Sequence, residues 1–181
     1  LYFLFIFIFI NSNFLTADTL PDCPSDKKQV YHNCFGTHSD PGISYTGEWQ
    51  NNKMNGMGTI SFENGASYAG EWKNNRMHGV GISIFPNGDK YEGEFKYGKF
   101  DGLGILSHAD GKKEFGGWQN NKLNGFAIKI NTYGKIDKAG IFVDDLFIGP
   151  VDVSQTNKNH GLCIDMGALK GSLEHVLCMV E

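Results

Sequence analysis

The motif Tyr45-Thr-Gly-Glu-Trp49 returns as Tyr68-Ala-Gly-Glu-Trp72 and as Tyr91-Glu-Gly-Glu-Phe95, and each copy begins 23 residues after the one before. A fourth copy, Glu114-Phe-Gly-Gly-Trp118, keeps the central glycine and the tryptophan. So many coincidences at one spacing identify an internal repeat, which is the sequence signature of a solenoid or an array. Four turn glycines keep the same period: Gly65, Gly88, Gly111 and Gly134.

Each repeat is predicted to be a pair of short β-strands. Alternation along residues 45–49 places both rings and the glycine between them on one face, where the glycine leaves room for a ring from the neighbouring strand. Asn64-Gly65 is predicted to close a two-residue hairpin, and Asn51-Asn52-Lys53 to make the longer, opposite turn. A lone hairpin is not stable in water. The sequence therefore predicts an all-β, elongated antiparallel meander of stacked hairpins with an aromatic ladder along one side.

The pattern Tyr-x-Gly-Glu-Trp, followed by Gly-x-Gly and then Asn-Gly, resembles the MORN repeat (membrane occupation and recognition nexus). The resemblance covers about residues 44–149, with three good copies and two or three weak ones. It implies a β-hairpin solenoid used for protein contacts, dimerisation or association with membrane lipids. The family includes stand-alone scaffolds and repeat blocks attached to junctophilins, plant phosphatidylinositol phosphate kinases and a histone methyltransferase.

Both ends of the chain differ from the repeats. Residues 1–17 begin with ten unbroken apolar residues, too few to span a bilayer as a helix, and are interpreted as a signal peptide. A retained membrane anchor and a buried strand are the alternatives. The missing initiator Met and basic leader indicate a fragmentary reading frame. Residues 18–43 are a polar lead-in whose end, Cys34-Phe-Gly-Thr37 with Gly42, resembles half a repeat.

The C-terminal segment, residues 150–181, carries a helical stripe within 165–180 formed by Met166, Leu169, Leu173, Val176, Leu177 and Val180. Asp165 is a reasonable N-cap. We expect this helix to cap the last open strand, because exposed sheet edges favour aggregation. A partner-binding helix and a frayed tail are the alternatives.

Two columns of side chains are candidate binding residues. The aromatic ladder is either core or a groove for a partner: Tyr45, Trp49, Tyr68, Trp72, Tyr91, Phe95 and Trp118. The basic column is either a solvated turn or a surface for anionic lipid headgroups: Lys53, Arg76, Lys99 and Lys122. An acidic column at Glu48, Glu71 and Glu94 is expected to offset its field.

Four cysteines suit local disulfides in an oxidising compartment, with Cys23–Cys34 and Cys163–Cys178 as the natural pairs among three connectivities. The spacing His-x-x-Cys at 160–163 and 175–178 is a weaker zinc alternative, and no metal or other cofactor is predicted. No catalytic motif is present, so the chain is not expected to be an enzyme. A formal net charge of −4 argues against a nucleic-acid partner.

The sequence therefore favours a non-enzymatic scaffold or recognition module that contacts a protein partner or another copy of itself. An adaptor for anionic lipid, and a regulatory segment of a longer, truncated enzyme, are the alternatives. The N-terminal segment predicts export to the periplasm or outside the cell, or membrane association.

Overall fold

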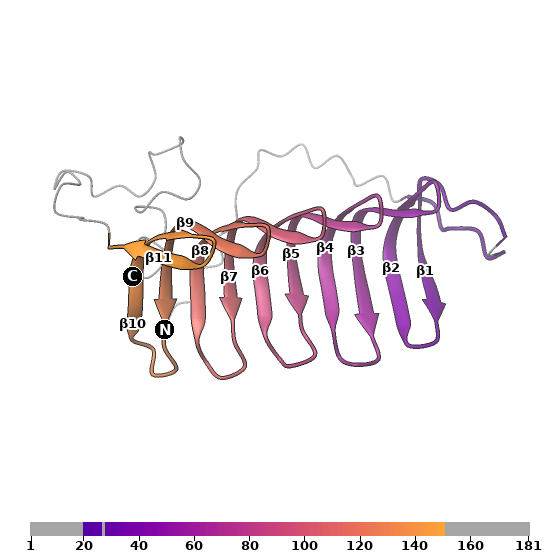
Figure 1. Cartoon of the computed structure of the whole chain (residues 1–181). Helices are drawn as coiled ribbons and strands as arrows, with labels where there is room; N and C mark the ends of the chain where they lie inside the picture. Colours follow the sequence, from indigo (N-terminus) through magenta and orange to yellow (C-terminus); the bar gives the residue numbers. More distant parts are fainter. Residues whose placement is uncertain (1–19, 27, 151–181) are drawn as a thin grey trace, which may run out of the picture.

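The computed structural model describes residues 20–26 and 28–150. These residues form a single antiparallel sheet in which every strand pairs with its neighbours in the sequence (Figure 1). The predicted all-β hairpin meander is confirmed. The predicted 165–180 helix and the 1–17 segment lie outside the described residues. The strands are β1 (Cys34–Asp40), β2 (Ile43–Gln50), β3 (Lys53–Phe62), β4 (Ser67–Lys73), β5 (Arg76–Ile84), β6 (Lys90–Lys96), β7 (Lys99–Ser107), β8 (Lys113–Gln119), β9 (Lys122–Ile130), β10 (Ile136–Val143) and β11 (Leu146–Gly149).

The two kinds of turn are the reverse of those predicted. Asn51 and Asn52 alone connect β2 to β3, and both have positive φ (52° and 59°), as the tightest hairpins require. The Asn64-Gly65 pair lies in a longer loop, where Phe62 N donates to Ala66 O and Gly65 N donates to Phe62 O. Only Gly65 has positive φ there (85°), so this loop is a turn followed by one left-handed residue. Two-residue turns in which both residues have positive φ are formed by Asn51-Asn52, Asn74-Asn75, Tyr97-Gly98, Asn120-Asn121 and Asp144-Asp145.

The sheet has an inner face and an outer face, as the alternation predicted. In β4, Tyr68, Gly70 and Trp72 are buried, whereas Ala69 and Glu71 are exposed. The pairing of β4 with β5 shifts register after Gly70, and the same irregularity recurs in each repeat after the motif glycine. Bulges of this kind bend strands. Figure 1 shows the bend: in each hairpin of the row, the two ends point in different directions.

The N-terminal edge of the sheet is covered by the lead-in. Asp22 bridges Phe35 of β1 in parallel, and the backbone bonds Cys23 N to Phe35 O and Phe35 N to Pro21 O join the two segments. A disulfide between Cys23 and Cys34 holds them together. At the other end, β10 and β11 form a shorter hairpin, in which only residues 141–143 of β10 pair with β11. Part of the exposed edge that an open sheet presents is therefore blocked at β1.

Candidate functional site

The aromatic ladder exists, and its rings form the core of the inner face. Tyr68 packs edge-on against Trp72 of its own strand (ring centroids 5.1 Å apart) and against Phe95 of the next repeat (5.0 Å). Tyr45 makes the same two contacts, with Trp49 at 5.0 Å and Trp72 at 5.4 Å. Edge-on packing at these separations is favourable beyond the area it buries. All ladder rings except Trp49 are buried, so they build the wall of a site and are not an exposed platform.

The ladder's polar atoms are bonded within the sheet. The single hydrogen of Tyr68 Oη is shared between Glu71 O at 2.9 Å and His78 O at 3.3 Å, while Trp72 Nε1 donates to Gly58 O at 3.1 Å. Burial raises the pKa of Tyr68 to about 12; the Glu71 charge adds to the rise, and the His78 backbone bond opposes it. Burial likewise raises the pKa of the Tyr45 and Tyr91 phenols. The phenols are therefore neutral near pH 7 and hold the strands together.

The motif glutamate has a structural role that the sequence interpretation missed. The carboxylate of Glu71 accepts a hydrogen bond from Val80 N at 3.0 Å, beside the bulge, and lies against Gly79. Glu48 and Glu94 do the same for Met57 N and Leu103 N. These carboxylates do not simply offset the basic column, because each satisfies a backbone donor that the bulge leaves unpaired. Their recurrence beside the motif glycine in three copies is the signal that could have revealed this role.

The hairpin asparagines connect one repeat to the next. Asn75 Oδ1 accepts from Met54 N at 2.7 Å, and Asn75 N donates to Met54 O at 3.0 Å. The same pair of bonds joins Asn121 to Phe100 and Asp145 to Leu123. A turn side chain therefore fixes the spacing between successive hairpins.

Two adjoining hollows on the inner face, which share Phe85, form what we call the apolar trough. The first hollow has a volume of about 400 Å³ and the second about 360 Å³. Phe62, at the first hollow, is 40% exposed. Volumes of this size are typical of ligand pockets. The first hollow is lined mainly by Met54, Ile60, Phe62, Tyr68, Trp72, Met77 and Phe85, with Arg76 and Ser83; the second by Phe85, Pro86, Asn87, Asp89, Phe100 and Leu106.

Charged side chains lie at the far end of the trough. Glu114 takes the place of the ladder tyrosine in the fourth repeat, and Lys129 Nζ lies 2.9 Å from its Oε1. His108 lies between two carboxylates, with Nδ1 3.4 Å from Asp89 Oδ2 and Nε2 3.8 Å from Glu114 Oε1. A hydrogen bond from Ala109 N is the main cause that lowers the pKa of Asp89. Of these charged residues, Asp89 lines the second hollow, so the trough carries one carboxylate at that end.

The basic column is exposed and wider than predicted. Lys53, Arg76, Lys99 and Lys122 begin β3, β5, β7 and β9, directly after the two-residue turns. Across the hairpins, Lys73 pairs with Arg76 and Lys96 with Lys99, which adds two basic residues that sequence reasoning missed. Lys122 faces Asp144 at 3.8 Å and Lys99 donates to Asn120, but in residues 20–26 and 28–150 the others have no ion pair.

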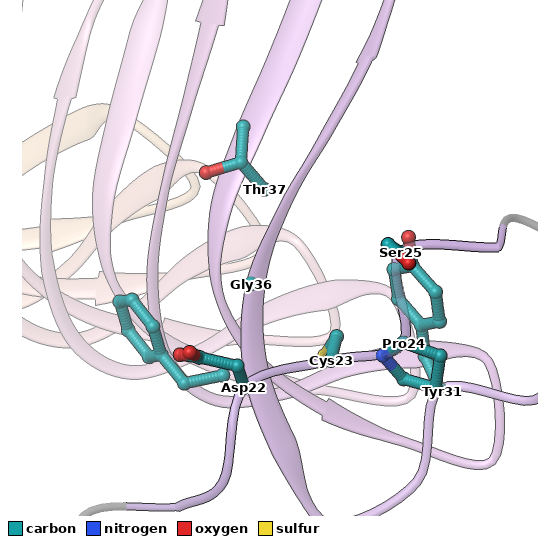
Figure 2. Close-up of a pocket in the computed structure, with 8 residues that line it drawn as sticks. Asp22, Cys23, Pro24, Ser25, Tyr31, Gly36 and Thr37 are labelled. Carbon is teal, nitrogen blue, oxygen red and sulfur yellow. The ribbon is translucent and has the colours of Figure 1, made fainter.

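A separate hollow, which is not part of the apolar trough, lies where the lead-in covers β1 (Figure 2). It has a volume of about 400 Å³ and is lined by both the lead-in and β1, including Asp22, Tyr31 and Thr37. Tyr31 packs edge-on against Trp49 at 5.3 Å, so the lead-in extends the ladder by one ring. Cys163 and Cys178 lie outside the described residues, as does the His-x-x-Cys pattern.

Within the described ranges, no group of three or more His, Cys, Asp or Glu residues is placed to hold a metal ion. Across the same part of the chain, no helix is long and apolar enough to cross a membrane.

The fold and these contacts define a class: a tandem-hairpin repeat protein whose repeats are tied together by recurring Tyr, Trp, Glu and Asn contacts. Comparison with protein families matches four consecutive stretches to the MORN repeat, at residues 45–67, 68–90, 91–113 and 115–130. The chain is therefore a MORN-repeat protein. MORN repeats are generally modules for interaction with proteins or lipids. A comparison with curated proteins gave no match.

Proposed function

We propose that this chain is a non-enzymatic recognition module that binds an extended segment of a partner protein in the apolar trough. The trough carries the proposal, because it is a concave apolar surface that residues 20–26 and 28–150 leave open. Partly exposed apolar surface of this kind marks interaction sites in soluble proteins. The ladder beneath it is rigid, since its polar atoms are bonded, and a pre-organised wall lowers the cost of binding.

The length of the trough sets the size of the partner segment. It runs from β3 to β7, and neighbouring strands lie about 4.8 Å apart, so it spans about 20 Å. An extended peptide rises about 3.3 Å per residue, so about six residues fill it.

The test uses a displayed library of random peptides selected on the immobilised full chain. Phe62→Glu places a charge at the trough, and Phe35→Glu is the matched control, because Phe35 is 45% exposed and lies on the outer face. We expect selected peptides to lose at least tenfold in affinity with Phe62→Glu and to keep their affinity with Phe35→Glu. Equal effects of both variants, or no selected peptide, would remove the proposal.

A second candidate function is adhesion to anionic lipid through the basic edge. Lys73–Arg76 and Lys96–Lys99 are like-charge cross-strand neighbours, which disfavour folding and are compatible with a surface kept for an anionic partner. Each basic residue near such a membrane contributes about 1 kcal/mol. Sedimentation with vesicles that contain or lack phosphatidylserine tests it. Lys73→Glu with Lys96→Glu leaves the trough intact, and unchanged sedimentation of this variant would exclude the lipid function.

We further propose that the protein works in an oxidising compartment, after export or at a membrane. The Cys23–Cys34 disulfide supports this, because structural disulfides are rare in reducing cytosol. Cell fractionation with thiol labelling tests it, and a cytosolic chain with both thiols reduced would contradict it.

A further inference from the structure

One residue that lines the first hollow is smaller than its counterparts in the neighbouring repeats. Ile60, Ser83 and Leu106 occupy the same position in successive repeats, 23 residues apart. Ser83 lies between Tyr68 and Tyr91 in the pairing of the sheet, and it is 7% exposed. The neighbouring repeats fill this position with a branched aliphatic side chain. The smaller serine lines the first hollow.

Two polar side chains that line this hollow differ in their exposure to solvent. The Ser83 residue lines the buried part, and Arg76, which is exposed, lines the hollow at the first residue of β5. Arg76 has no ion pair within the described ranges, and its cross-strand neighbour is Lys73. A guanidinium binds a carboxylate through two parallel hydrogen bonds. The complement of the hollow is therefore a large apolar group with a carboxylate beside it.

We propose that the Ser83 hollow is the anchor pocket of the trough. It takes one large apolar side chain from an extended segment of a partner protein, and an acidic residue next to that side chain pairs with Arg76. This inference rests on the proposed function and adds the chemistry of the segment. The carboxylate of Asp89 lines the second hollow and repels an acidic residue there. The two opposite charges therefore set the direction of the segment along the trough.

The experiment fills the pocket without adding charge. A displayed library of random peptides is selected on the immobilised full chain and then assayed on purified variants. Ser83→Leu inserts the residue type that the next repeat already carries at this position, and Ser83→Val is a smaller second filler. Ser83→Ala is the control that removes only the hydroxyl. Circular dichroism establishes that each variant keeps its sheet.

We expect selected peptides to share a large apolar residue adjacent to Asp or Glu. Their affinity falls at least tenfold with Ser83→Leu, falls several-fold with Arg76→Gln, and stays within twofold with Ser83→Ala. Peptides that bind Ser83→Leu and Ser83→Val at full affinity, yet lose binding with Phe62→Glu, would overturn the anchor pocket and leave the trough as the site. Peptides insensitive to both substitutions would overturn both proposals.

A small ligand is the competing occupant. An aromatic sulfonate dye, 8-anilinonaphthalene-1-sulfonate, has an apolar body and one anionic group. If its fluorescence rises with the wild-type chain and not with Ser83→Leu, while no peptide is selected, the hollow binds a small anion and the segment proposal is wrong.

Discussion

Replacing Gly81 by alanine tests the packing that supports the trough. The φ of Gly81 is not positive, so alanine can adopt this backbone without strain. The added Cβ would lie 2.5 Å from Tyr68 Oη and 2.6 Å from two of its ring carbons. The phenol must therefore move, and its bonds to Glu71 O and His78 O are lost. Overpacking costs about 1–3 kcal/mol, and loss of the phenol's one shared hydrogen bond about 1 kcal/mol. We expect the free energy of unfolding to fall by about 2–4 kcal/mol.

Urea denaturation followed by tryptophan fluorescence measures this loss. Gly65→Ala is the matched control, because Gly65 has φ +85° and no atom lies within 4 Å of its added Cβ. The control pays only for a left-handed conformation, about 1–2 kcal/mol. If Gly81→Ala costs no more than Gly65→Ala, the tyrosine is not held against the glycine.

Other variants and conditions test the remaining contacts. Asn75→Ala loses the bond to Met54 N and a residue type that tolerates φ 64°, so we expect it to cost about 2 kcal/mol in urea denaturation, and Asn75→Gly about half of that. Equal costs would show that only the lost hydrogen bond matters, because glycine adopts a positive φ without strain. Joint replacement of Cys23 and Cys34 by serine opens a loop whose ends are 11 residues apart and should lower the free energy of unfolding by about 3 kcal/mol. Unchanged hydrogen exchange in β1 would contradict the role of the disulfide in the cap. Because the pKa of Tyr68 is raised in the folded state, its contribution is complete below pH 10 and is lost as pH rises toward about 12. There the free energy of unfolding should fall by about 1.4 kcal/mol per pH unit for each such phenol, and Tyr68→Phe should make the fall less steep. A slope that Tyr68→Phe leaves unchanged would exclude this phenol as the cause.

The sequence was sufficient to predict the fold and the two faces of the sheet. The 23-residue period and the alternation along 45–49 are local signals, and they report burial directly. The identity of the turns was not predictable in this way. Asn64-Gly65 and Asn51-Asn52 both tolerate positive φ, so local preference does not decide between them. The choice depends on Asn75 and its equivalents bonding the previous hairpin, which is a contact between repeats.

The site was predicted only in part. The sequence identified the ladder residues, but these rings are buried and form the wall of the trough. Many of the other residues that line its two hollows lie between the repeated motifs. Ser83 was not predicted as a site residue because it belongs to no repeated motif. Only its alignment with Ile60 and Leu106 shows that its side chain is unusually small for this position. Lys73 and Lys96 were not predicted to join the basic column, because they become neighbours of Arg76 and Lys99 only through pairing across a hairpin.

Methionine-methyl NMR shows which face of the sheet a partner segment binds. Met54 and Met77 line the first hollow, whereas Met57 is 55% exposed on the outer face. With a selected peptide added to the full chain, we predict that the methyl signals of Met54 and Met77 shift and that the Met57 signal does not. A shift of Met57 alone would place binding on the outer face and exclude the trough as the binding site.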